Sequence, residues 1–215
     1  MRRLALLFAV TIAASTSTAF AASLSVGSWH IWAGSQALTK ATCTLSGTTS
    51  TTDTYVDEKF PTTTAGGSTT LSVGPKSGQR TWAFVRFDLS SCNIPATGGA
   101  DSATLNLRIT TAPGSTQTLD VAPVLTTWDG TLTWNGAQAL TYGANFATIT
   151  TGTTSNVTKS VTVTADVDAL IKNGGSSFGW RVSEAGSVTN VTTIFGSSEN
   201  ATAANQPQLV VNYEK

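Results

Sequence analysis

The sequence predicts an all-β protein, a jelly-roll β-sandwich with one short helix. About nine short runs alternate between apolar and polar residues, which is the period of a half-buried β-strand. The segments between them, among them TAGGS, APGS and NGGSS, are rich in residues that favour turns. Several short strands separated by turns are typical of sandwiches and jelly rolls. The expected strands are residues 54–58, 69–73, 81–89, 103–110, 118–124, 160–164, 178–182, 191–196 and 208–213.

One segment, TADVDALIKNGG, has the pattern of a short helix. Thr164 can cap its start, Asp166 and Asp168 suit the positive N-terminal end, and Gly174 can end it. No other segment predicts a helix, so we expect the rest of the chain to be strands and turns.

Two of the expected strands, 81–89 and 103–110, have an apolar side that suits the space between the two sheets of a sandwich. The opposite side of 81–89 would lie on an outer face of one sheet. If the two strands pair, Arg86 and Arg108 stand near each other on that face. The inward residues are Ala83, Val85, Phe87, Leu89, Ala103, Leu105, Leu107 and Ile109, and the outward residues of the first strand are Trp82, Phe84, Arg86 and Asp88.

The chain begins with the three parts of a secretory signal peptide. Arg2 and Arg3 form a charged start, residues 4–14 an apolar segment, and residues 19–21 a cleavage site of the A-x-A type. We therefore expect residues 1–21 to be removed and the protein to be secreted to the extracellular space. No later segment is apolar enough to predict insertion into a membrane.

An exported chain with two cysteines is expected to form one disulfide, here Cys43–Cys92. Residues 22–52 are interpreted as an N-terminal extension that this disulfide pins to the domain formed by residues 53–215. Removing Arg2 and Arg3 from the twelve Lys and Arg leaves ten, against twelve Asp and Glu. This balance lacks the basic face that nucleic acids require, so nucleic acid is not an expected partner.

The residue patterns of common active sites are missing. A glycosidase needs two carboxylates at a defined separation, and no motif pairs Asp120, Asp129, Glu184 or Glu199. A lyase needs a base such as histidine or tyrosine, and the single histidine, His30, lies in the extension. There is no G-x-S-x-G elbow and no phosphate-binding loop. We therefore expect no enzyme and no catalytic residues.

Four motifs follow one another between residues 53 and 213. They are DTYVDEKFPTTTAGGSTTLSVG; FVRFDLS followed by SATLNLRI; TTWDGTLTWNG; and VTADVDALIKNG with SFGWRV and FGSSENATAANQPQLVVNY. In their order and spacing they resemble the DNRLRE domain family of secreted jelly-roll carbohydrate-binding modules. Residues 22–52 lie outside the match, and Asp129 with Gly130 stands where the family usually has a glutamate.

The resemblance implies a non-catalytic accessory module of polysaccharide-degrading or surface systems. Some members of the family bind acidic polysaccharides such as alginate, so the expected ligand is a polysaccharide. The chain would act alone or through a partner, either at the cell surface or an enzyme. The alternative, from a different class, is a structural protein of the cell surface or extracellular matrix that uses the same sandwich for assembly. Neither function requires a cofactor.

Sugars bind against aromatic faces, and acidic sugars also attract arginine. The expected ligand-binding residues form two groups. For an outer-face group, the alternative is cross-strand pairing with Arg86 bonded to Asp88 or Glu199. For the tryptophan loop, the alternative is that both indoles lock the loop onto the core. The outer-face group is Trp82, Phe84, Arg86, Asn106, Arg108 and Arg181, and the loop group is Trp128 and Trp134.

A structural calcium ion is a further expectation, because jelly-roll sugar modules often hold one with carboxylates and carbonyls. Asp53, Asp57 and Glu58 cluster at the first strand of the expected domain and are the candidate ligands. Asp166 and Asp168 are a second cluster, but the positive end of the helix explains them without a metal.

Overall fold

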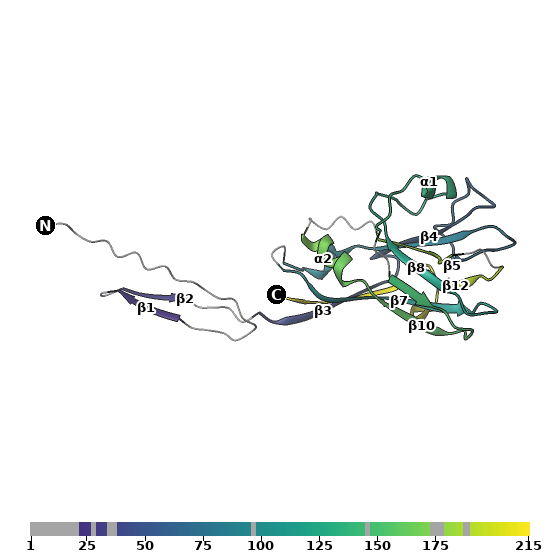
Figure 1. Cartoon of the computed structure of the whole chain (residues 1–215). Coiled ribbons are helices and arrows are strands. Elements are labelled where there is room, and N and C mark those ends of the chain that lie inside the picture. Colours follow the sequence, from purple (N-terminus) through teal and green to yellow (C-terminus); the bar gives the residue numbers. More distant parts are fainter. Residues whose placement is uncertain are drawn as a thin grey trace. The chain divides into compact units, whose positions relative to one another are not determined.

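The computed structural model describes residues 22–26, 29–33, 38–95, 98–144, 147–172, 179–186 and 190–215. The signal peptide expected at residues 1–21 lies outside these. The chain divides into two compact units, Met1–Leu38 and Thr39–Lys215. In the first unit, strands β1 (Ala22–Val26) and β2 (Trp29–Ala33) pair antiparallel as a hairpin. The second unit is a two-sheet sandwich (Figure 1).

Both sheets of the sandwich are antiparallel, which confirms the all-β class predicted from the alternating runs. We call them the β7 sheet and the β6 sheet after one strand of each. The β7 sheet contains, in order, β3 (Lys40–Ser46), β13 (Gln208–Glu214), β7 (Ala100–Thr111), β12 (Thr193–Gly196) and β5 (Thr70–Val73), with β10 (Val157–Thr162) also paired to β7. The β6 sheet contains, in order, β4 (Thr51–Asp57), β6 (Thr81–Phe87), β11 (Trp180–Glu184), β8 (Thr118–Pro123) and β9 (Ala147–Thr150).

The expected helix is α2 (Thr164–Lys172), and the indole of Trp180 on β11 donates a 2.7 Å hydrogen bond to Asp166 near its start. A second helix, α1 (Trp134–Gln138), was not predicted; the Thr133 hydroxyl accepts from the Gly136 amide and caps it. Two 3₁₀ turns complete the secondary structure, η1 (Leu89–Cys92) and η2 (Ala203–Asn205). None of the helices in the described part of the chain is long and apolar enough to cross a membrane.

The core between the sheets follows the predicted alternation. Leu105, Leu107 and Ile109 of β7 are at most 1% exposed, and Val85 of β6 is fully buried. Leu89 is only partly buried, because the chain leaves the strand after Phe87 and turns into η1. Burial of these aliphatic side chains on both sheets holds the two layers together.

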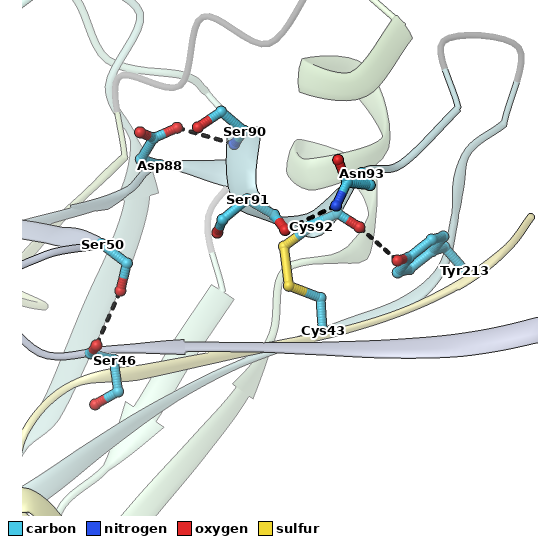
Figure 2. The surroundings of a disulfide bond; sticks show 9 residues. All are labelled: Cys43, Ser46, Ser50, Asp88, Ser90, Ser91, Cys92, Asn93 and Tyr213. Carbon is cyan, nitrogen blue, oxygen red and sulfur yellow. Dashed lines mark hydrogen bonds between the residues drawn. A yellow bond between two sulfur atoms is a disulfide. The ribbon is translucent and has the colours of Figure 1, made fainter.

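Cys43 and Cys92 form the expected disulfide, with an S–S distance of 2.06 Å (Figure 2). Cys43 belongs to β3 of the β7 sheet, whereas Cys92 ends η1, which follows β6 of the other sheet. The hydroxyl of Tyr213 on β13 donates to the Cys92 carbonyl and anchors the same turn. The bridge therefore connects the two sheets.

The sandwich begins before the expected boundary at residue 53. Strand β3 pairs with β13 over its whole length, and the compact unit starts at Thr39. The sequence did not predict this strand because its inward side carries only the small residues Ala41 and Cys43 besides Leu45, its single aliphatic buried residue. Cys43 is thus part of the sandwich itself rather than of an appended extension.

Candidate functional site

The structure separates the expected outer-face residues into two groups on different sheets. Arg86 lies on β6 and Arg108 on β7, which belong to different sheets, so the two strands do not pair and the two arginines do not stand near each other on one face. The chain passes from one sheet to the other through η1 after Phe87. Trp82, Phe84, Arg86 and Arg181 therefore share one outer face, while Asn106 and Arg108 share the other.

The outer face of the β6 sheet is covered by the tryptophan loop. Phe84 is fully buried, and Trp128 and Trp134 are 5% and 8% exposed. The ring centroid of Phe84 lies 5.6 Å from that of Trp128, and that of Trp82 lies 4.5 Å from that of Trp134. This arrangement matches the alternative in which both indoles lock the loop onto the sheet.

The two arginines on this face lie over aromatic rings. The guanidinium carbon of Arg86 is 5.4 Å from the centroid of Trp128. That of Arg181 is 4.7 Å from Trp82 and 4.1 Å from Tyr142, whose pKa is raised by burial. Cation–π contacts of this kind hold the arginines against the face that they would otherwise present to a ligand.

Arg86 forms no ion pair among the described residues, so the expected bond to Asp88 or Glu199 is not found. The carboxylate of Asp88 accepts the Ser90 amide and caps η1 (Figure 2), and this bond holds the pKa of Asp88 below its usual range. Glu199 accepts the hydroxyl of Ser198 instead. Arg86 therefore faces Trp128 rather than either acid.

The outer face of the β7 sheet is lined by amides and hydroxyls that bond to one another across strands. Asn106 accepts from the Ser160 hydroxyl at 2.7 Å and donates to Gln208 at 3.3 Å. Farther along, Asn212 accepts from Thr42 at 2.6 Å and donates to Ser102 at 2.8 Å. These bonds fix the orientation of each amide, so the face presents an ordered set of donors and acceptors.

A pocket of about 210 Å³ opens on this face around Arg108. It is smaller than the roughly 300–1,000 Å³ of sites for drug-sized ligands, and so suits a single small polar unit. Arg108 donates one long bond of 3.4 Å to Thr158, its Nε atom is enclosed without an acceptor, and it forms no ion pair within the described ranges. The lining residues are Asn106, Arg108, Thr158, Ala203, Ala204, Gln206 and Gln208.

Most of this pocket was missed by reasoning from the sequence. Its walls come from β7, β10, β13 and the segment around η2, which are far apart in the chain. Gln206 is held in place by donating to the carbonyls of Ser198 and Asn200, at 3.1 and 2.9 Å. Of the lining residues, only Asn106 and Arg108 were expected from the sequence.

The three expected calcium ligands do not come together. Asp57 accepts the Lys59 amide at 2.8 Å, and Glu58 accepts the Arg80 amide at 2.9 Å, both at the exposed end of β4. Asp53 lies four residues before Asp57 on β4 and is 2% exposed. Its side chain is on the side of the strand that faces the core. No group of three or more His, Cys, Asp or Glu residues suited to a metal occurs in the described part of the chain.

Two of the carboxylates considered as catalytic acids, Asp129 and Glu184, have local partners instead. Asp129 accepts from the amide and hydroxyl of Thr131, and these bonds lower its pKa. Glu184 lies 3.6 Å from Arg80, while burial raises its pKa. His30 belongs to β2, and its side chain lies outside the described residues.

In comparisons with known proteins, no protein-family model and no curated protein sequence matches this chain. The function must therefore be argued from the sites. The β6 face is filled by its own aromatic and arginine side chains, while the β7 face presents a pocket with an arginine, amides and hydroxyls.

Proposed function

We propose that this protein is a secreted, non-catalytic carbohydrate-binding module that binds an acidic polysaccharide through the Arg108 pocket. The observation that carries the proposal is a cation without an ion-pair partner among the described residues, set in a field of oriented amides and hydroxyls. A guanidinium binds carboxylates through directed hydrogen bonds, while amides and hydroxyls bind sugar hydroxyls. A uronate unit offers both kinds of group.

Features of the sequence support the same proposal. The motifs from Asp53 to Tyr213 resemble the DNRLRE domain family, and the N-terminal segment resembles a signal peptide. A disulfide between the sheets suits an oxidising compartment such as the extracellular space. The module would act at a polysaccharide surface alone or with an enzyme or cell-surface partner.

Replacing Arg108 tests the proposed site. Arg108→Ala should weaken binding to alginate or another polyuronate about tenfold or more, because a hydrogen bond to a charged group is lost. Isothermal titration at fixed ionic strength measures the affinity. Raising the salt concentration should weaken binding by the unmodified protein, because an exposed charge pair is screened.

Arg86→Ala is the matched control, because it removes the same side chain from the opposite outer face. Its affinity for the polyuronate should stay within about twofold of that of the unmodified protein, since Arg86 lies over Trp128 and away from the pocket. Unchanged affinity in a folded Arg108→Ala variant would contradict the proposed site.

The alternative is a structural protein of the cell surface or extracellular matrix, and the hairpin of the first unit favours it. The β1–β2 register pairs apolar residues with each other at three of its five positions. Two-stranded hairpins are marginally stable alone in water, so such a hairpin gains from a second copy. A glycan array and sedimentation would separate the proposals: self-association without binding to any polymer favours assembly. The paired positions are Ala22 with Ala33, Leu24 with Ile31 and Val26 with Trp29.

A further inference from the structure

Ser198 joins two acidic side chains inside the sandwich. Its amide donates to Asp53 Oδ2 at 2.7 Å, and its hydroxyl donates to Glu199 Oε1 at 3.0 Å. Asp53 comes from β4 of the β6 sheet, whereas Ser198 and Glu199 follow β12 of the β7 sheet. The two carboxyl groups therefore meet where the sheets face each other.

The second oxygen of each carboxyl group has no partner. Asp53 Oδ1 and Glu199 Oε2 are both enclosed by protein and accept no hydrogen bond. Thr51 lies two residues before Asp53 on the same side of β4, is 5% exposed, and its Oγ1 is likewise enclosed and without a partner. One small region of β4 and the segment after β12 thus supplies unpartnered oxygen atoms from three side chains.

Leaving these oxygens unpaired is costly. A buried polar atom without a partner costs about 1–3 kcal/mol, and two neighbouring buried carboxylates also repel each other. The side chains of Asp53 and Glu199 are close enough to interact with each other directly. The side chains that β5 and β6 place in this part of the core include Leu71, Val73, Ala83, Val85 and Phe87, and none of them carries a charge.

We propose that Asp53 Oδ1, Glu199 Oε2 and Thr51 Oγ1 form a calcium-binding site that fastens the segment after β12 to β4. A cation placed among these atoms pairs every unpartnered oxygen of the two acids and removes their repulsion. Ser198 orients the site, because it holds the other oxygen of each carboxyl group. The Glu199 amide donates to Ser197 Oγ, whose hydroxyl donates to the Ser68 carbonyl, and so the acidic segment is tied to the loop before β5.

The donor set favours calcium over other metals. All three atoms are oxygens, which are the ligands of hard cations, whereas zinc prefers nitrogen and sulfur. Calcium tolerates irregular geometry and takes six to eight oxygens, so water or carbonyl oxygens would complete the shell. Magnesium demands a near-ideal octahedron and gives up its water reluctantly. Two carboxylates predict weak binding, with a Kd on the order of 10⁻⁴–10⁻³ M.

Thermal unfolding of the full-length protein at pH 8 tests the site. Calcium chloride at 10 mM should raise the Tm by about 3–10 °C relative to the protein in EDTA, because the ion binds the folded state. Magnesium at the same concentration should have a smaller effect. Asp53→Asn and Glu199→Gln should each abolish the calcium response, since each removes a charged ligand without changing the size of the side chain.

Asp57→Asn is the matched control, because Asp57 lies on the same strand but bonds the Lys59 amide at its end. This variant should keep the full calcium response. Titration of calcium into the unmodified protein, followed by calorimetry, provides a measurement that does not depend on any variant folding.

Three results would overturn the proposal. The first is an unmodified protein that shows no heat of calcium binding and no change in Tm. The second is a response that persists in Asp53→Asn or Glu199→Gln. The third is a protein whose Tm depends on pH but not on calcium, which would mean that a shared proton, rather than a metal, neutralises the pair. Binding at Arg108 is measured separately, so neither result decides the other.

Discussion

At the scale of single residues, Gly179 shows how one position can join two strands. Its φ is +71°, and a Cβ placed there would lie 2.1 Å from the carbonyl oxygen of Val85 on β6. The backbone just before β11 thus passes directly against β6. Gly78 has a similar φ of +80° but no heavy atom within 4 Å of the same position. Comparing Gly179 with Gly78 separates two costs of replacing a glycine: that of a positive φ and that of a steric clash with a neighbouring strand.

Gly179→Ala is expected to lower the free energy of unfolding by about 4 kcal/mol or more, because strand β11 must move away from β6. Gly78→Ala should cost only about 1–2 kcal/mol, which is the cost of a left-handed backbone for alanine. Urea unfolding of both variants measures the difference. An equal loss of unfolding free energy in the two variants would mean that β11 can move away from β6 without destabilising the protein. The close approach at Gly179 would then not be important for stability.

At the scale of elements, the segment that carries α1 forms a second apolar core on the outside of the β6 sheet. Val56 and Phe84 come from the sheet, and Trp128, Leu132 and Trp134 come from the segment. Sandwich sheets commonly leave one face to water, but here a loop covers it. The aromatic residues of this core therefore hold the loop on the sheet.

Trp134→Ala should lower the free energy of unfolding by about 3–5 kcal/mol, because a large buried side chain is removed. Phe60→Ala, at a residue 52% exposed, should change it by less than about 0.5 kcal/mol. Chemical denaturation provides both values. A folded Trp134→Ala variant should bind polyuronate with the same affinity as the unmodified protein. A folded variant that no longer binds would indicate that the tryptophan loop contributes to the ligand site.

At the scale of the whole molecule, the disulfide and the chain crossings connect the sheets. The Cys43–Cys92 bridge spans 49 residues, a stretch that includes β4, β5 and β6. Because β3 is a strand of the β7 sheet and η1 follows a strand of the β6 sheet, the bridge joins both layers. It also restricts the conformations of the unfolded chain. Its contribution belongs to the fold as a whole rather than to any one element.

Replacing both cysteines by serine should lower the free energy of unfolding by about 4 kcal/mol, since the loop that the bridge closes is long. Guanidinium unfolding of the variant and of the oxidised protein measures this loss. A reducing agent should lower the stability of the unmodified protein and leave the variant unchanged. A small loss would indicate that the unfolded chain is already compact without the bridge.

Much of the fold could be predicted, because strands with one buried side carry their own alternation. The strand with Ala83, Val85 and Phe87 and the strand with Leu105 and Leu107 were recognised in this way. Strand β3 was missed, since two of its three inward residues, Ala41 and Cys43, are small, and so was α1, which is too short for a helical repeat. The candidate pocket was predicted only in part, since Asn106 and Arg108 were named but Gln206 and Thr158 were not.

The sequence by itself determined the all-β class, the inward residues of the main strands, the helix at Thr164 and the pairing of the cysteines. These depend on local periodicity and on the number of cysteines. Only the tertiary structure decided that Arg86 and Arg108 lie on opposite outer faces, that the tryptophan loop is a second core, and that Asp53 meets Glu199. The physical reason is that strand order and loop placement bring distant residues together, and alternation along one strand carries no information about its neighbours.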